Sequence, residues 1–307
     1  MAIANLFIRN NFRAFIDEFE VGFCPGVNVL IGDNGTGKTT LLKGMYANMK
    51  DLARARIIIF SEGSDEFIVK MPEHYIGVFC RFSSEPKQGV YIPEKDILEH
   101  AKGLLPFIEQ KHTGFDEIYK DVLISAQDVP TTVQSEMQRS IGNHISKIID
   151  GIVEWDQGDG TFYMIRTDGS RIPFSHEASA YKKLGYLGLL VSCGRLEPGT
   201  ILFWDEPENS LNPEIMPRLV RILLELAQSG VQIFIATHSY DLARYFDIRK
   251  DKDIPVLFHN LVKKQGGGIV CHSSPEYVKL PDNHMEKASE KLFKAVVTDA
   301  LEVQGNE

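Results

Sequence analysis

A stretch of nine residues near the start of the chain has the composition and spacing of a phosphate-binding loop. Residues 32–40 read Gly-Asp-Asn-Gly-Thr-Gly-Lys-Thr-Thr and fit the pattern Gly-x4-Gly-Lys-[Ser/Thr]. The glycines allow the backbone to turn its amides toward phosphate oxygens, and a following helix directs its positive end at the same charge. We expect Lys38 to reach the β- and γ-phosphates of a nucleotide and the Thr39 hydroxyl to bind Mg²⁺. The predicted nucleotide contacts are Asn34, Gly35, Thr36, Gly37, Lys38, Thr39 and Thr40.

The sequence around this loop favours phosphate binding over a glycine-rich turn that binds nothing. The apolar run Val27–Ile31 predicts a strand before the loop, and Leu41–Lys50 predicts a helix after it. A strand, a glycine-rich loop and a helix in this order are the context that the motif requires.

A second candidate is an apolar strand that ends in two carboxylates, Asp205 and Glu206. In an open parallel sheet, ligands bind beyond the carboxyl ends of the strands, so this strand end and the phosphate-binding loop should share one edge. We expect Asp205 to hold the magnesium ion through water and Glu206 to act as general base toward the attacking water. The pair could instead cap a helix, but Asn212-Pro213 supplies the cap expected for a helix over Glu214–Gln228.

His238 follows the next predicted strand, Val231–Ala236, within the segment Thr237-His238-Ser239. A single histidine is more often structural than catalytic. Its position favours a role in the site, because one crossover helix separates this strand from the Asp-Glu strand and both should end in the same crevice. We therefore expect His238 to sense the γ-phosphate or to position the attacking water.

Together these motifs resemble the ATP-binding-cassette (ABC) type of ATPase head over nearly the whole chain. The segments that carry the resemblance are Gly32–Thr40, Asp205–Glu208, Ser210–Pro213 and Thr237–Ser239. The opening Leu6–Phe15 and the run Leu202–Pro213 are similar to the RecF/OLD-like branch of AAA family ATPases. The resemblance implies an α/β fold: an ABC-type P-loop NTPase core with a mostly parallel sheet flanked by helices, an antiparallel β part and an inserted helical lobe.

The same resemblance implies cofactors and partners. ATP and Mg²⁺ would bind between two heads, which predicts a homodimer or higher oligomer. Many members of the branch work with a nuclease or another effector in anti-phage defence, so a separate effector protein, a nuclease or a toxin, is expected. OLD-type proteins carry a Toprim nuclease lobe after the head, and the chain is expected to be too short to hold one.

In such dimers each head completes the other's site with a signature loop, which carries a Ser-Gly pair before a helix. The best match is Glu177–Gly185, with Ser179 in place as a nucleotide contact and Ala180 where glycine is expected. An alanine Cβ hinders close approach of backbone to phosphate, so completion of the site by the partner stays open. The alternative is a helix start that does not contact the partner's nucleotide, although helix starts bind anions without this glycine.

Two weaker candidates concern the metal and the adenine base. Glu94 follows a core strand at the place where transporter-type heads carry a glutamine; it either holds a metal-bound water or lies at a solvated helix start. Adenine needs an aromatic or arginine platform, which Arg13, Phe12 or Phe15 could provide. Core packing explains the two phenylalanines equally well.

The patterns along the chain divide it into three parts. Residues 1–93 are expected to form the first part of the ATPase core, residues 94–174 an inserted helical lobe with a β-hairpin, and residues 175–307 the second part of the core. The expected elements include strands at 56–60, 66–71, 76–82 and 256–258, a hairpin at 151–174 and a helix at 286–301. The helical lobe is too short for a long coiled-coil arm.

The overall composition fits a cytoplasmic enzyme. With 42 acidic against 33 basic residues the formal net charge is −9, so nucleic acid is expected only as a ligand of an assembled complex. No apolar stretch reaches the roughly 20 residues of a membrane span, which predicts no membrane partner. The four cysteines are too scattered for a zinc site or a disulfide framework.

Several functions are compatible with these motifs. An ATPase should release phosphate with Glu206 as its base. A slow or non-hydrolysing ATP-bound switch would instead use nucleotide occupancy to assemble or restrain a partner, such as a nuclease or toxin. A transporter motor should carry a full Ser-Gly-Gly signature and a glutamine loop, which are missing, and a nucleic-acid motor of the DNA-repair type is a further alternative.

Overall fold

The computed structural model describes residues 3–8, 15, 18–53, 58–60, 67–69, 78–83, 87–111 and 117–304. A six-stranded sheet lies at its centre, in the order β14-β13-β3-β12-β11-β7. These strands are β3 (Val27–Gly32), β7 (Gly89–Ile92), β11 (Ile201–Asp205), β12 (Gln232–Ala236), β13 (Val256–Lys263) and β14 (Ile269–Ser274). Neighbouring strands run parallel from β13 to β7, and the edge strand β14 pairs antiparallel with β13.

Burial explains why these apolar runs form central strands. Every residue of β3, β11 and β12 is buried, as expected of parallel strands that are covered on both faces. The register sets Asp205 opposite Ala236, so β11 and β12 end side by side. The strands that the sequence predicts before the glycine-rich loop, the carboxylate pair and His238 are thus confirmed, and the strand predicted at 256–258 extends to Lys263.

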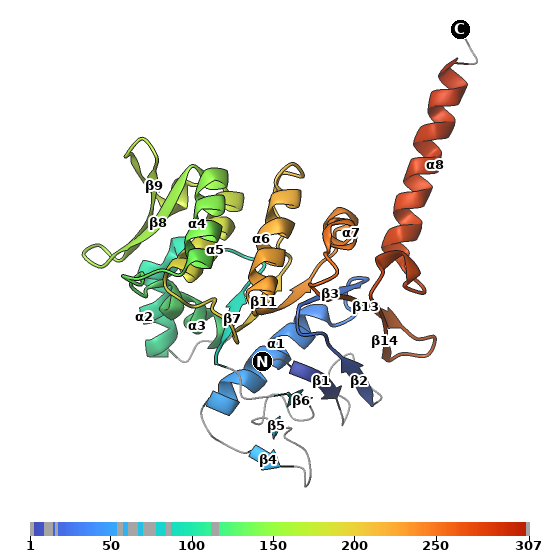
Figure 1. The fold of residues 1–307 in the computed structure, drawn as a ribbon, viewed down its shortest axis with the longest axis horizontal. Coiled ribbons are helices and arrows are strands. Elements are labelled where there is room, and N and C mark those ends of the chain that lie inside the picture. The colour runs from blue at the N-terminus through green and yellow to red at the C-terminus, as the bar shows by residue number, and fades with distance from the viewer. Residues whose placement is uncertain are drawn as a thin grey trace.

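Helices cover both faces of this sheet (Figure 1). Helix α1 (Lys38–Ala53) packs against β11, β12 and β7 on one side and against a second, antiparallel sheet on the other. Helices α6 (Met216–Gln228) and α7 (Tyr240–Arg249) lie on the opposite face and pack against each other. The two sheets therefore enclose α1 between them, and with it the end of the glycine-rich loop.

The start of α6 differs from the expected one. The sequence predicts a helix from Glu214, whereas α6 begins at Met216. Asn212 Oδ1 still accepts a hydrogen bond from Glu214 N at 3.1 Å, but it caps a turn ahead of the helix. The reason is Pro217, which has no N–H to donate and is tolerated only in the first turn of a helix.

The second sheet is antiparallel and has the order β2-β1-β6-β5-β4. Its strands are β1 (Ile3–Ile8), β2 (Phe19–Gly22), β4 (Ile58–Phe60), β5 (Phe67–Val69) and β6 (Val78–Phe82). The strands expected at 56–60, 66–71 and 76–82 are confirmed as β4, β5 and β6 within the described residues.

A helical lobe lies beside β7 and β11 (Figure 1). It contains α2 (Ala101–Lys111), α3 (Glu117–Ala126), α4 (Glu136–Ile149) and α5 (Ser179–Ser192), with β8 (Gly151–Asp156), β9 (Thr161–Arg166) and β10 (Arg171–Pro173) between α4 and α5. The hairpin expected at 151–174 has a third strand, since the sheet order is β10-β9-β8. The short 3-10 helices are η2 (Leu98–His100), η3 (Phe174–His176) and η4 (Tyr277–Lys279).

The last helix, α8 (His284–Gln304), extends away from the body of the molecule (Figure 1). It corresponds to the polar helix expected at 286–301 and is longer at both ends. With it, the expected α/β fold is confirmed: a mostly parallel sheet flanked by helices, an antiparallel β part and an inserted helical lobe. Within the described part of the chain, no helix combines the length and apolarity that crossing a membrane requires.

Candidate nucleotide-binding site

The glycine-rich loop joins β3 to α1, and its conformation requires glycine. Gly32, Gly35 and Gly37 have φ angles of 140°, 75° and 90°, which side chains disfavour. A Cβ at Gly37 would lie 2.8 Å from the ring of Phe15, and one at Gly32 would lie 2.4 Å from the carbonyl oxygen of Leu261. The loop therefore keeps a backbone shape that presents amide groups rather than side chains to a ligand.

Lys38 lies inside this loop. Its side chain is buried, and Nζ donates hydrogen bonds to the carbonyl oxygens of Gly32 at 2.7 Å and Asp33 at 3.1 Å. Burial lowers the pKa of Lys38 to about 8, against the opposing effect of nearby carboxylates, first among them Glu206. An ammonium group held at the centre of the loop is placed to meet phosphate oxygens that enter it.

The other predicted contacts of the loop lie around this lysine. Asn34 and Gly35 are exposed at its outer turn, whereas Thr36 is buried and donates from Oγ1 to Asp33 O at 2.9 Å. Thr39 is exposed on the first turn of α1 and Thr40 is half-buried beside it. Thr36 thus shapes the loop, and Asn34, Gly35, Thr39 and Thr40 remain accessible to a ligand.

Thr39 and Asp205 meet at the end of the central sheet. Thr39 Oγ1 donates to Asp205 Oδ1 at 3.1 Å, and Tyr91 Oη donates to Asp205 Oδ2 at 3.4 Å. Asp205 is only 4% exposed, and burial raises its pKa, with a further contribution from the charge of Glu94. A hydroxyl and a carboxylate beside a phosphate-binding loop are the oxygen ligands that suit Mg²⁺.

The oxygen atoms of Thr39 and Asp205 suit a magnesium ion that is bound partly by the protein and partly by substrate. Among the described residues, no three His, Cys, Asp or Glu side chains cluster so as to enclose a metal ion. Mg²⁺ in phosphate-transfer sites needs no such cage, because it keeps several waters and binds one or two protein oxygens together with substrate phosphates. Thr39 and Asp205 therefore fit Mg²⁺ bound with a nucleotide.

Glu206 follows Asp205 and lies next to His238. The carboxylate Oε1 is 3.4 Å from His238 Nε2, and the side chains are 26% and 35% exposed. Burial raises the pKa of Glu206, and the charges of Glu94, Glu208 and Asp205 add to this effect. Burial and the charge of Lys38 lower the pKa of His238, so its imidazole is neutral near pH 7. The structure thus brings Glu206, His238 and Lys38 to one edge of the sheet.

Glu208 holds the loop that carries His238, a contact that the sequence analysis missed. Its Oε1 accepts hydrogen bonds from Thr237 Oγ1 at 2.6 Å, His238 N at 2.9 Å and Ser239 N at 3.1 Å. The only signal in the sequence is that Glu208 lies within the Asp-Glu-Pro-Glu run. One carboxylate therefore fixes the backbone that positions the imidazole.

Glu94 lies beside the acidic residues of the site, whereas a neighbouring residue caps the turn that begins the helical lobe. Glu94 Oε1 accepts a hydrogen bond from Asn209 Nδ2 at 3.3 Å, and its charge contributes to the raised pKa values of Asp205 and Glu206. Asp96 Oδ1 accepts from Leu98 N at 3.0 Å and so caps the turn that begins the lobe. For Glu94, the geometry therefore favours a place beside the acidic residues of the site over a place at a solvated helix start.

Ser179 lies away from this cluster, at the exposed first turn of α5. Among the described residues, no hydrogen bond joins it to the glycine-rich loop of its own chain. Ala180 is a buried helical residue, and its φ is not positive, so the position does not require glycine. Just before it, Glu177 accepts two hydrogen bonds from Arg166 Nη2, at 2.6 and 2.7 Å, which anchors the start of α5.

The residues considered for adenine binding are only partly described. Arg13 and Phe12 lie outside the described residues. Phe15 is 1% exposed, packs edge-on against Phe19 with 4.8 Å between ring centroids, and lies against Gly37. A ring buried in this way packs against the glycine-rich loop and belongs to the core.

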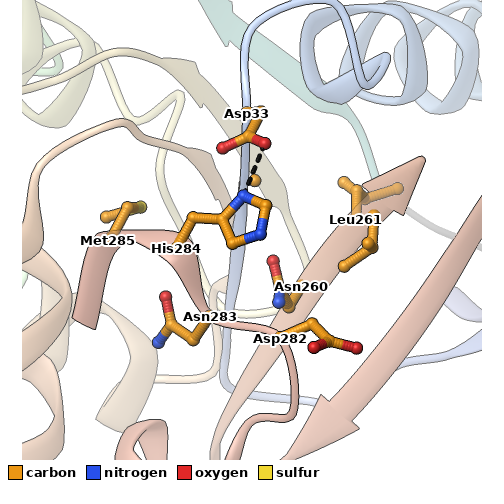
Figure 2. A pocket seen from close by; sticks show the side chains of 9 residues that line it. Asp33, Asn260, Leu261, Asp282, Asn283, His284 and Met285 are labelled. Carbon is orange, nitrogen blue, oxygen red and sulfur yellow. Dashed lines mark hydrogen bonds and ion pairs between the residues drawn. The ribbon is translucent and has the colours of Figure 1, made fainter. Parts of the chain in front are cut away.

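A small cavity of about 10 Å³ lies on the outer side of the loop. Figure 2 shows that Asp33 and His284 point toward one another there, and His284 Nδ1 lies 2.7 Å from Asp33 Oδ2. The two side chains are 58% and 57% exposed. This contact joins the glycine-rich loop to the first residue of α8.

Comparison with known proteins identifies the family. A family model described as "AAA domain, putative AbiEii toxin, Type IV TA system" matches residues 59–244, more than half of the chain. A second model, described as an AAA domain, matches residues 9–47. Together the two models include the glycine-rich loop, the Asp205-Glu206 pair and His238.

The chain is also similar to curated ATP-binding proteins of transport systems. The chain is 26% identical over 280 residues to the L-cystine import ATP-binding protein TcyN of Bacillus subtilis, covering 85% of this chain and 88% of that protein. It is 25% identical over 214 residues to the energy-coupling factor transporter ATP-binding protein EcfA2 of Mesomycoplasma hyopneumoniae, and spans 61% of the length of that protein.

Two solved structures share the fold at 11% sequence identity. One is an SmcHead bound to the C-winged helix domain of ScpA, with a TM-score of 0.56 over 92% of this chain and 99% of that chain. The other is an Smc head domain with an extended coiled coil, bound to the C-terminal domain of ScpA derived from Pyrococcus furiosus, with a TM-score of 0.53 over 95% and 99%.

Proposed function

The chain belongs to the AAA-domain family whose model spans residues 59–244 and is an ATP-binding, ABC-like ATPase head, and we propose that it hydrolyses Mg-ATP. The proposal rests on one observation. Thr39 Oγ1 donates a hydrogen bond of 3.1 Å to Asp205 Oδ1, next to the pair Glu206 and His238, whose Oε1 and Nε2 atoms are 3.4 Å apart. The metal ligands, the base and a polarising histidine thus stand together at the loop that would receive the triphosphate.

The proposed mechanism assigns a separate task to each residue. The amides of the glycine-rich loop and Lys38 bind and orient the phosphates, and Thr39 with Asp205 would hold Mg²⁺. When bound, Mg²⁺ neutralises negative charge on the β- and γ-phosphates. Glu206 orients a water molecule and accepts its proton, and neutral His238 hydrogen-bonds near the γ-phosphate. Catalysis then rests mainly on positioning and charge stabilisation.

We propose further that two heads close around ATP, with Ser179 of each facing the nucleotide of the other. Two features support this: Ser179 is exposed at a helix N-terminus, and Ala180 is helical without a positive φ, so the backbone conformation there does not require glycine. ATP-dependent closure would control a separate effector protein. The family description, which names a toxin, and the resemblance to ATPases of anti-phage defence support this part.

The test compares the protein with Glu206→Gln. The wild-type protein should release phosphate, and the variant should lose about 10²- to 10⁴-fold in kcat while its ATP affinity changes little. A matched control is Glu154→Gln, an exposed glutamate on β8 that should leave kcat unchanged. Titration calorimetry measures the affinity, and light scattering of the Glu206→Gln protein with ATP should show a dimer.

Two results would contradict the proposal. Turnover that survives in Glu206→Gln would remove Glu206 as base, and no heat on titrating Mg-ATP into the wild-type protein would remove the site. Tight ATP binding without turnover in the wild type would favour the non-hydrolysing switch. A pull-down with and without ATP identifies the effector chain, and a preparation that turns over ATP on DNA without any partner would argue against a separate effector.

A further inference from the structure

Lys183 is a buried lysine behind the strand end that carries Asp205 and Glu206. It lies on α5, is 5% exposed, and donates from Nζ to the carbonyl oxygen of Glu206 at 2.9 Å. Burial lowers the pKa of Lys183, and the charges of Glu208, Glu94, Glu206 and Asp205 oppose that effect. A buried ammonium group is retained only where partners compensate its lost hydration, and here the partners belong to the site.

The backbone that Lys183 contacts is strained. Glu206 has a φ of 47°, in the left-handed region that residues with a Cβ disfavour. Pro207 follows it, and a residue before proline is pushed toward extended conformations. Strain of this kind persists only where the surroundings over-determine the conformation, and it is concentrated at functional sites.

Three hydrogen bonds hold the peptide groups of Glu206. Its N–H donates to Ala236 O at 2.9 Å, and its carbonyl oxygen accepts from Asn209 N at 3.1 Å as well as from Lys183 Nζ. The first bond joins the backbones of Glu206 and β12, and the second closes a backbone turn within the same segment. Lys183 supplies the one side-chain bond of the three, and it brings that bond from a different element, α5.

The strained conformation has a consequence for catalysis. In an extended strand, successive side chains point to opposite faces, so Asp205 and Glu206 would diverge if β11 simply continued. The left-handed turn instead leaves Asp205 Oδ1 with its hydrogen bond of 3.1 Å from Thr39 Oγ1. It also brings Glu206 to 3.4 Å from His238.

We propose that Lys183 is a positioning residue that holds Glu206 in this left-handed conformation and so aims its carboxylate into the nucleotide site. The inference rests on the proposed role of Glu206 as general base. It assigns to α5 a task within its own chain, in addition to the contact that its first residue, Ser179, would make with a partner.

The neighbouring Lys182 provides a matched control. It lies on the same helix and is 6% exposed, yet its Nζ bonds to Glu99 and lies 3.9 Å from Asp96. Both lysines are therefore similarly buried, and of the two only Lys183 bonds to Glu206.

The kinetic test compares Lys183→Met, Lys183→Arg and Lys182→Met. Lys183→Met should lower kcat about 10- to 100-fold, because the base loses its alignment, while the dissociation constant for ATP stays within about twofold. Lys183→Arg, which keeps a charged donor, should recover part of the rate. Lys182→Met should keep the wild-type kcat. If Lys183→Met does not fold, Lys183→Gln, which keeps an N–H donor without the charge, takes its place.

A second readout does not depend on turnover. Crystal structures of the nucleotide-free proteins should show Glu206 leaving its positive φ in Lys183→Met and keeping it in Lys182→Met. A Lys183→Met protein with wild-type kcat, or one in which Glu206 keeps φ near 47°, would overturn the inference. If the wild-type protein proves unable to hydrolyse ATP, the proposed function fails, while the φ of Glu206 still decides whether Lys183 sets this conformation.

Discussion

The Thr39 hydroxyl donates a hydrogen bond of 3.1 Å to Asp205 Oδ1, although 166 residues separate the two positions. Thr39 follows β3 and Asp205 ends β11, and β12 is the one strand between them. Because the three strands are parallel, their carboxyl ends lie at the same edge of the sheet, where ligands of such folds bind. This contact joins the phosphate-binding loop to the acidic strand end in a single site.

Asp205→Asn tests the role of this contact in metal binding. Asparagine keeps an oxygen that can accept from Thr39 but removes the negative charge that favours Mg²⁺. We expect phosphate release to fall about 10²- to 10³-fold. The gain in ATP affinity on adding Mg²⁺ to a metal-free sample should largely disappear, as measured by titration calorimetry.

Tyr91→Phe is the matched control, because it removes the hydrogen bond of 3.4 Å to the other oxygen of Asp205 and no charge. Its effect on turnover should stay below about fivefold, since a neutral hydrogen bond contributes about 1 kcal/mol. An Asp205→Asn protein with normal magnesium dependence would exclude Asp205 as a metal ligand.

The buried amine of Lys38 predicts a pH dependence of ATP binding. Its pKa in the nucleotide-free protein is lowered to about 8, so above this pH the side chain loses its proton and its charge. A neutral amine attracts phosphate weakly, so the association constant for ATP should fall above pH 8, by up to about tenfold per pH unit. The bound triphosphate stabilises the charged form, so kcat should vary less over the same range.

The measurement is a series of ATP titrations between pH 7 and pH 10, with kcat determined in the same buffers. Lys38→Arg, whose side chain stays charged, should bind ATP with little pH dependence over this range. Constant affinity of the wild-type protein up to pH 10 would contradict the placement of a titrating amine in the loop.

Glu208 should control turnover through the backbone around His238. Glu208→Ala leaves the Thr237 hydroxyl and the amides of His238 and Ser239 without their shared acceptor. We expect a loss of about 1–3 kcal/mol in the free energy of unfolding and a lower kcat, because the imidazole is no longer held. Glu208→Gln keeps an acceptor oxygen and should retain most of both. Equal kcat in Glu208→Ala and wild type would show that His238 needs no such support.

Gly37→Ala tests the shape of the phosphate-binding loop. The new Cβ would lie 2.8 Å from the Phe15 ring at a residue with φ of 90°, so the variant should lose about 1–3 kcal/mol of stability and most of its ATP affinity. Gly103→Ala is the contrast, since nothing lies within 4 Å of the added Cβ in α2. It should stabilise the protein by about 0.5–1 kcal/mol in urea unfolding. Unchanged ATP affinity in Gly37→Ala would argue against the loop as the phosphate site.

The helix boundary at Met216 shows where local reading of the sequence falls short. Asn212-Pro213 has the chemistry of a helix start, and Asn212 does cap the turn that follows it. The helix itself begins at Met216, directly before Pro217. Two prolines compete for the first turn, and the later one cannot lie inside a helix. A start at Glu214 would place Pro217 beyond the first turn, so the second proline sets the boundary at Met216.

The sequence was enough to predict the chemistry of the loop and of the acidic strand end, and the strands and helices that carry them. Glycine spacing, apolar runs and caps are local, and they act over a few residues. Three contacts became visible in the folded chain alone: Glu208 holds the backbone of His238, Tyr91 bonds to Asp205, and Lys183 bonds to the strained Glu206. These contacts join elements far apart in the chain, and their geometry depends on how strands pair and helices pack, which no local pattern specifies.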